Sequence, residues 1–336
     1  MKLNFEKIKE ITLGAVRINE ENGVISFGRF NEEEEELYRV TSENFYKKTF
    51  SASGVKFLFK TNSKKIYIDL EIELSTTRNY FAVDVCVNNE LISSIDNYWD
   101  VELERDYTKM DFPLGEYKKE ISLGDGEKEV CVYFPWSAKV MLKEISVDDD
   151  CYIIPVKPQK ILLAYGDSIT HGYDSLHPSN KYITKLAEFL DAEEINKAIG
   201  GEKFFPPLSE IKNDIKPDYV TVAYGSNDWG YENREEFVNK VRKFFLNISA
   251  NYPDAKIFAI TPIWRADITD ENYDSFRNIE KDIIKAVENI KNVSIISGFD
   301  LVPENEDYYA DTFLHPNDEG FKYYAENIIK KIKTLI

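Results

Sequence analysis

Residues 161–170 read ILLAYGDSIT, an unbroken apolar run that leads straight into a polar turn. Apolar runs of the same kind follow at 219–224 (YVTVAY), 256–261 (KIFAIT) and 293–297 (VSIIS). Apolar residues that do not alternate with polar ones are typical of parallel strands covered by helices on both faces. Helical patterns lie between these runs, as in 234–248, where the apolar residues form one stripe with the period of an α-helix. Alternating strands and helices predict an α/β fold with a doubly wound parallel sheet.

Residues 1–155 follow a different pattern. Short segments with period-two alternation are separated by clusters of Gly, Asn, Ser and Asp, and the clearest segment is KKIYIDLEIEL at 64–74. Strands of this kind without intervening helices predict an antiparallel β-sandwich that is jelly-roll-like. The pattern changes around Pro155 and Pro158, so we expect an accessory sandwich domain at 1–155 and a second domain at 156–336.

Charge and composition narrow the possible partners. The chain has 336 residues with 60 acidic and 42 basic side chains, which gives a formal net charge of −18. This charge argues against binding to nucleic acid or anionic membrane surfaces, because both attract Lys and Arg. No run approaches the ~20 apolar residues of a membrane helix, and charged residues interrupt the N-terminal apolar ones, so we expect a cytoplasmic protein. The acidic run Glu32–Glu36 is expected to be a solvated loop, with a cation or partner site as the alternative.

The cysteines give no sign of a metal site. Cys86, Cys131 and Cys151 have neither C-x-x-C spacing nor another spacing typical of metal ligands. The first two lie in alternating strand patterns, so we expect buried thiols, with a disulfide as the alternative.

Polar residues gather at the carboxyl ends of the predicted parallel strands, where the loops of a doubly wound sheet form the ligand crevice. Ser168, Gly201 and Asn227 each follow a strand, and His315 precedes the last helix. A serine hydroxyl becomes a nucleophile when a neighbouring base takes its proton, and His315 is the candidate base. Attack on an ester carbonyl develops an oxyanion, which the backbone N–H groups of Ser168 and Gly201 and the Asn227 amide can stabilise. This set predicts acyl transfer and implies no metal or cofactor.

Four sequence blocks in this half resemble those of a known family, the SGNH (GDSL-type) hydrolases. The blocks are GDSIT (166–170), NKAIGG (196–201), GSND (225–228) and DTFLHPND (311–318). The resemblance covers roughly 160–336, and the layout of the whole chain is similar to the subgroup with an N-terminal β-sandwich. It implies a flavodoxin-like sheet, Ser168 as nucleophile, Gly201 and Asn227 with Ser168 as oxyanion donors, and His315 as base.

The last block departs from the family pattern. The family usually has Asp three residues before His, whereas here Thr312 holds that place and Asp311 lies four residues before His315. Either Asp311 reaches the ring across one extra residue, or a backbone carbonyl orients the ring and the site works as a serine–histidine dyad. The G-x-S-x-G elbow of α/β-hydrolases is absent from the sequence.

Three further residues are weaker candidates. Trp229, Trp264 and His177 lie beside the blocks and could line a substrate pocket, with plain packing as the alternative. His171 is expected to face away from the site.

The resemblance leads us to expect a serine esterase that removes a short acyl group, such as acetyl, through an acyl-enzyme on Ser168. The expected substrate is a small-molecule or carbohydrate ester, and a homo-oligomer is compatible with the sequence. One alternative is an acyltransferase that uses an alcohol as acceptor at the same site. Another is a glycan-binding protein whose hydrolase half is inactive.

Overall fold

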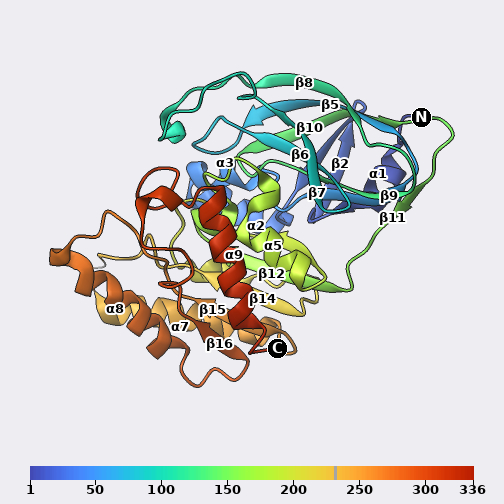
Figure 1. The fold of residues 1–336 in the computed structure, drawn as a ribbon. Helices are drawn as coiled ribbons and strands as arrows, with labels where there is room; N and C mark the ends of the chain where they lie inside the picture. The colour runs from blue at the N-terminus through green and yellow to red at the C-terminus, as the bar shows by residue number, and fades with distance from the viewer. Residues whose placement is uncertain (231–232) are drawn as a thin grey trace.

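The computed structural model describes residues 1–230 and 233–336 of the chain. Figure 1 shows the N-terminal half, blue to green, lying above the C-terminal half, yellow to red. Two antiparallel sheets form the upper half and one parallel sheet with its helices forms the lower half.

The two antiparallel sheets confirm the predicted sandwich. In order of pairing, one sheet consists of β2 (Arg17–Glu21), β3 (Val24–Gly28), β10 (Ala138–Val147), β5 (Lys65–Leu74) and β8 (Gly115–Ser122). The other consists of β1 (Thr12–Leu13), β4 (Lys56–Thr61), β9 (Lys128–Tyr133), β6 (Ala82–Val87) and β7 (Glu90–Asp96), and β11 (Ile153–Pro155) pairs with β4.

Period-two alternation places one face of each sheet in a shared core. In β5, Ile66, Ile68, Leu70 and Ile72 are at most 2% exposed, while the residues between them are only partly buried. These side chains pack in one cluster with apolar side chains of β4 and β9 from the opposite sheet. The alternation ends before the strand does, because Leu74 is exposed.

The acidic run Glu32–Glu36 is not a solvated loop, so this expectation is wrong. It forms the first turns of α2 (Glu32–Thr41), one of three helices in this half with α1 (Phe5–Ile11) and α3 (Glu43–Thr49). Asn31 and Glu34 form a capping box at the start of α2, and acidic side chains stabilise a helix N-terminus. Glu34 is fully buried, and its ion pair with Lys197 of the other half offsets the cost of burying the charge.

The C-terminal half contains the predicted parallel sheet. In order of pairing its strands are β13 (Ala192–Asn196), β12 (Lys160–Gly166), β14 (Tyr219–Ala223), β15 (Lys256–Ile260) and β16 (Val293–Ile296). Every pair is parallel, and the order 2-1-3-4-5 is that of flavodoxin-like folds. The fold class expected from the sequence is therefore confirmed.

Helices cover both faces of the parallel sheet (Figure 1). One face packs on α7 (Arg234–Asn251) and α8 (Asp270–Val287), and the other packs on α5 (Tyr182–Phe189) and α9 (Asp318–Ile332). The shorter helical elements are α4 (Ser168–His171), α6 (Pro206–Glu210), η1 (Tyr107–Lys109), η2 (Pro178–Asn180) and η3 (Glu306–Tyr308). In the described part of the chain, no helix has both the length and the apolar character needed to cross a membrane.

The two halves share apolar clusters. Phe30 and Tyr38, from the N-terminal half, belong to the same buried cluster as Phe204 and the β14 side chains. Trp136, after β9, packs on Tyr173 with ring centroids 4.8 Å apart. The division into domains at 1–155 and 156–336 stays a prediction from the sequence pattern.

Candidate active site

Ser168 lies at the tight turn between β12 and α4. β12 ends at Gly166, where an added Cβ would lie 2.4 Å from Thr170 Oγ1, so the turn leaves no room for a side chain there. Asp167 caps the short helix, because its Oδ1 accepts a hydrogen bond from the Ile169 N–H at 3.1 Å. Since Asp167 fills the capping position, the Ser168 hydroxyl remains available for another partner.

That partner is His315, 147 positions further along the chain. Ser168 Oγ lies 2.7 Å from His315 Nε2, and both side chains are largely buried, with 12% of the His315 side chain exposed. Asn317 caps α9 two residues later by accepting a hydrogen bond from the Gly320 N–H, so the histidine loop is tied to a helix start. A hydroxyl donating to an imidazole at this distance is the arrangement that general-base catalysis requires.

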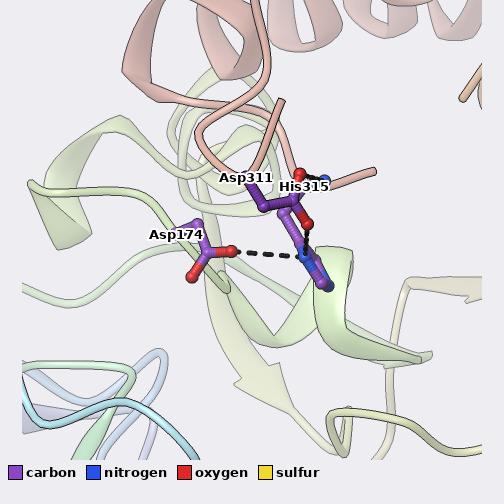
Figure 2. A group of neighbouring side chains, drawn as sticks. All are labelled: Asp174, Asp311 and His315. Carbon is purple, nitrogen blue, oxygen red and sulfur yellow. Dashed lines mark hydrogen bonds and ion pairs between the residues drawn. The ribbon is translucent and has the colours of Figure 1, made fainter. Parts of the chain in front are cut away.

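Asp311 reaches the other ring nitrogen of His315. Its Oδ2 lies 2.6 Å from Nδ1 (Figure 2), and its Oδ1 accepts hydrogen bonds from the N–H groups of Phe313, Leu314 and His315. Thr312 adopts a left-handed conformation with φ of 69°, which lets the loop turn within the four-residue spacing. Of the two arrangements that the sequence left open, the structure contains the one in which Asp311 bonds to the ring.

A second carboxylate, which the sequence analysis missed, faces the same ring nitrogen. Asp174 Oδ2 lies 3.2 Å from His315 Nδ1, and Figure 2 shows Asp174 and Asp311 approaching the imidazole from different sides. Asp174 is fully buried. Its carboxylate accepts a forked pair of hydrogen bonds from Arg78, at 2.8 and 3.1 Å, and a further one from the Tyr80 hydroxyl.

The two carboxylates dominate the electrostatics of the imidazole. Burial lowers the pKa of His315, but the charges of Asp174 and Asp311 and their interactions with the ring outweigh it and raise the pKa to about 9. Burial raises the pKa of Asp174, but His315 and Arg78 outweigh it and lower the pKa to about 2. The pKa of Asp311 is also lowered, chiefly by its hydrogen bond with His315 acting against burial. Both carboxylates are therefore ionised and favour the protonated ring that forms when it takes the serine proton.

The predicted oxyanion residues lie on two loops after parallel strands. Gly201 is exposed and has φ of 85°, and a Cβ there would find only Lys48 Nζ and Phe45 within 4 Å. Its neighbour Gly200 has no such space, because a Cβ there would lie 2.4 Å from the Tyr173 ring. Asn227 is half-buried, and its Nδ2 donates to the Glu202 carbonyl at 2.9 Å. An amide nitrogen carries two hydrogens, so this bond leaves one for a ligand.

Residues from the N-terminal half hold the loop that contains these glycines. The fully buried Arg29 donates to the carbonyls of Asn196 and Ala198 at 2.6 and 3.2 Å. Lys48 Nζ donates to the Gly200 carbonyl at 2.7 Å. Lys197 forms an ion pair with Glu34, as described above. The position of this loop therefore depends on contacts that cross between the halves.

His171 supports the same loop, and the hydrogen-bond partners of its ring are groups other than Ser168. Its Nδ1 accepts a hydrogen bond from the Gly200 N–H at 3.2 Å, and its Nε2 lies 2.7 Å from Ser51 Oγ. Burial, together with nearby cationic groups, lowers the pKa of His171 well below its usual value. A neutral ring can accept from Gly200, as the geometry requires.

The weaker candidates have other partners. His177 Nδ1 lies 2.8 Å from Asp84 Oδ1 in the sandwich. Trp229 is half-buried, with the Arg265 guanidinium 5.5 Å from its ring centroid. Trp264 is half-buried beside Tyr309, with ring centroids 5.4 Å apart. None of these contacts joins them to the Ser168–His315 pair, and their part in substrate binding stays a prediction.

Among the described residues, one group brings three possible metal-ligand atoms together, and it consists of Asp174, Asp311 and His315. The ring nitrogen in this group already interacts with both carboxylates at 2.6 and 3.2 Å. Attraction between the imidazole N–H and the two carboxylates accounts for the close approach of these three side chains.

The missed residues differ in how visible they are in the sequence. Asp174 lies only six positions after Ser168, so a search for carboxylates near the nucleophile block could have raised it. Arg78 lies 96 positions before Asp174, in a half with no recognisable catalytic motif. Only the folded structure could have revealed that pairing.

A family model described as GDSL-like lipase/acylhydrolase matches residues 164–323. No match was found among the curated proteins. The salicylyl-acyltransferase SsfX3 from a tetracycline biosynthetic pathway has a similar structure, with a TM-score of 0.77 and 18% identity over 96% of this chain and 94% of that chain.

Two other solved structures are similar over the whole length of the chain. A candidate GDSL-like lipase from Bacteroides ovatus has a TM-score of 0.77 and 19% identity over 99% of this chain and 97% of that chain. A family two carbohydrate esterase from Cellvibrio japonicus has a TM-score of 0.65 and 15% identity over 98% and 96%. At these identities the likeness is one of fold, and it includes both halves.

Proposed function

We propose that the protein is a serine esterase that removes a short acyl group, such as acetyl, and the premise is the match of residues 164–323 to the GDSL-like lipase/acylhydrolase family model. The observation that carries the proposal is the continuous line from Ser168 Oγ through His315 to Asp311, with contacts of 2.7 and 2.6 Å. A nucleophile, a base and a group that orients the base form the minimal set for acyl-enzyme chemistry.

The mechanism follows from these contacts. His315 Nε2 takes the hydroxyl proton as Ser168 Oγ attacks the ester carbonyl, and the Nδ1 proton stays hydrogen-bonded to Asp311. The N–H groups of Ser168 and Gly201 and the Asn227 amide stabilise the oxyanion. His315 then protonates the leaving alcohol, which leaves an acyl group on Ser168. Water, activated by the same ring, releases the acid and restores the serine.

An acylated carbohydrate is the substrate class that we propose. Similar structures include a family two carbohydrate esterase and an acetyl xylan esterase from Butyrivibrio proteoclasticus. The net charge of −18 is compatible with a neutral, polar substrate and disfavours a polyanionic one.

Acyl transfer to an alcohol is the second candidate, and one observation favours it. A salicylyl-acyltransferase is similar to this chain over 96% of its length. The two reactions share the acyl-enzyme and differ only in whether water or an alcohol attacks it.

Hydrolysis of p-nitrophenyl acetate and of acetylated sugars tests the proposal. Ser168→Ala should lower kcat/KM by about 10⁴-fold or more, since loss of the nucleophile removes the acyl-enzyme route. Ser249→Ala, which changes a helix α7 hydroxyl bonded to Asn292, should leave the rate unchanged. A fluorophosphonate should label Ser168 in the parent, as located by mass spectrometry.

Parent-level turnover by Ser168→Ala would reject the proposed role of this serine, and an inactive, unlabelled parent would favour a binding function. Added alcohols separate the two reactions. If acyl transfer to a millimolar alcohol is faster than hydrolysis, the protein is better described as an acyltransferase.

A further inference from the structure

Two carboxylates face one nitrogen of His315, and the family pattern accounts for only one of them. Asp311, in the histidine's own loop, bonds to Nδ1 at 2.6 Å. Asp174 lies in the segment after the nucleophile helix, and its Oδ2 is 3.2 Å from the same atom. Asp174 is therefore close enough to His315 Nδ1 to orient the ring and to stabilise its protonated form.

Asp174 is held in this place by its backbone as well as by its side chain. It has φ of 70°, a conformation in which residues other than glycine are uncommon. Its carbonyl accepts a hydrogen bond from the Tyr107 hydroxyl. Strained backbone is retained where the surrounding structure imposes it, and such residues cluster at functional sites.

The partners of the Asp174 side chain come from the N-terminal half. Arg78 and Tyr80 lie between β5 and β6, and they supply three hydrogen bonds to the carboxylate. The Arg78 guanidinium also lies 5.7 Å from the centroid of the Tyr173 ring, which is itself 5.7 Å from the His315 ring. A planar guanidinium fork fits a carboxylate in a fixed orientation, which a lysine ammonium cannot do.

We propose that Asp174 is a positioning residue for His315, that Arg78 and Tyr80 hold it ionised and in orientation, and that the N-terminal half thereby completes the charge balance of the catalytic centre. The inference rests on the proposed esterase function and extends it to the role of the sandwich.

The charges around the ring explain why His315 would need both Asp174 and Arg78. With a neutral ring, the carboxylates of Asp174 and Asp311 and the guanidinium of Arg78 leave one net negative charge. When the ring takes the serine proton, the group becomes neutral. Without Asp174, the same step would place a positive ring beside an unpaired Arg78, which is unfavourable in a buried site. Without Arg78, two uncompensated carboxylates would make the ring too basic to release its proton to the leaving alcohol.

Other groups around the ring do not duplicate this role. The Asp167 carboxyl also interacts electrostatically with His315, but its Oδ1 accepts the capping hydrogen bond from the Ile169 N–H of helix α4, whereas Asp174 and Asp311 lie against the ring nitrogen itself. Within the described part of the chain, the titratable and charged groups that face the imidazole are Asp167, Asp174, Asp311 and the Tyr173 phenol, and Arg78 lies behind Asp174.

The test is the pH dependence of kcat/KM, measured on the full chain with p-nitrophenyl acetate. Asp174→Asn suits the left-handed backbone, because asparagine tolerates it. It should move the acid limb to lower pH by about one unit and lower the plateau about tenfold, the lower range for a contact with a charged group. Arg78→Gln should move the acid limb to higher pH, and the double variant should return it close to that of the parent.

Controls separate this role from a purely structural one. Arg105→Gln removes another arginine that links the halves, through the Glu306 carbonyl and Asp307, and should leave the profile unchanged. Tyr80→Phe removes a single donor to Asp174 and should shift the limb in the same direction as Arg78→Gln, but less. It tests the inference even if Asp174→Asn does not fold. Arg78→Lys, which keeps the charge, should stay closer to the parent than Arg78→Gln.

Opposite shifts by Asp174→Asn and Arg78→Gln would support the inference. Unmoved acid limbs in the folded variants, including Tyr80→Phe, would overturn it while the parent remains active. Failure of the esterase proposal would look different, because the parent would then lack Ser168-dependent turnover and fluorophosphonate labelling.

Discussion

Asp311→Asn is the most informative single change at the site. The new amide keeps an oxygen that can accept from the three backbone N–H groups now bonded to Oδ1, so the loop should hold its shape. Its NH₂ group would face His315 Nδ1 and donate to it. That bond favours the tautomer with the proton on Nε2, which cannot accept the proton of Ser168.

The contacts set the size of the expected loss. A hydrogen bond to a charged group, here 2.6 Å long, contributes about 1.5–3 kcal/mol, or about 10- to 150-fold in rate. The unproductive tautomer adds to this, and the same change in the serine-protease triad costs about 10⁴-fold. Asp174, at 3.2 Å from Nδ1, still favours the productive tautomer. We therefore expect kcat/KM to fall by about 10²- to 10³-fold, between these two limits.

The assay is hydrolysis of an aryl acetate at a pH above the acid limb of the parent, with thermal unfolding followed in parallel. Asp307→Asn, in the neighbouring η3 and 77% exposed at its side chain, is the matched control and should leave the rate unchanged. A rate within twofold of the parent would refute the reasoning, because the site would then work as a dyad. A loss as large as that of Ser168→Ala would show that Asp174 gives no help to the ring.

Two further changes test the surroundings of the site. Gly200→Ala should lower kcat/KM at least tenfold, because its Cβ would lie 2.4 Å from the Tyr173 ring, which packs on His315. Steady-state kinetics alongside a melting curve would check it, and a fully active, stable variant would contradict the close packing. Alkylation of the folded protein should modify Cys151 before Cys131, because burial raises the pKa of the Cys131 thiol to about 11. Peptide mass spectrometry over time gives the order, and faster labelling of Cys131 would contradict it.

Local patterns were enough to predict the fold class. The unbroken run at 161–165 became the strand β12 inside the parallel sheet, and the alternation at 64–74 became β5 of the sandwich. In both cases the strand geometry decides which side chains are buried, so the apolar pattern along the sequence predicts the strand directly. The expectation of a solvated loop at Glu32–Glu36 was wrong in two ways. The helix start has a local signal in the capping box of Asn31 and Glu34, whereas the burial of Glu34 depends on Lys197, 163 positions away.

The site residues also differ in whether local sequence or long-range contacts define them. Ser168 and His315 could be predicted because their loops follow recognisable strands and carry recognisable blocks, although their hydrogen bond is a property of the fold. Asp174 could not be assigned a role, because that role depends on a left-handed backbone and on Arg78 from the other half. Contacts between distant segments leave no periodic signal in one sequence.

The N-terminal half holds the loop at 196–202 in place, and this has a consequence for protein engineering. Arg29 and Lys48 supply hydrogen bonds to carbonyls in that loop, and Tyr38 donates to Glu202. A fragment that starts at residue 156 would leave these acceptors to water, together with the buried ammonium of Lys197. If the sandwich is replaced by that of a relative, the chimera should therefore fail to fold correctly unless segment 29–48 and the loop at 196–202 come from the same protein. In a recombination library, active variants should take segment 29–48 and the loop at 196–202 from the same parent.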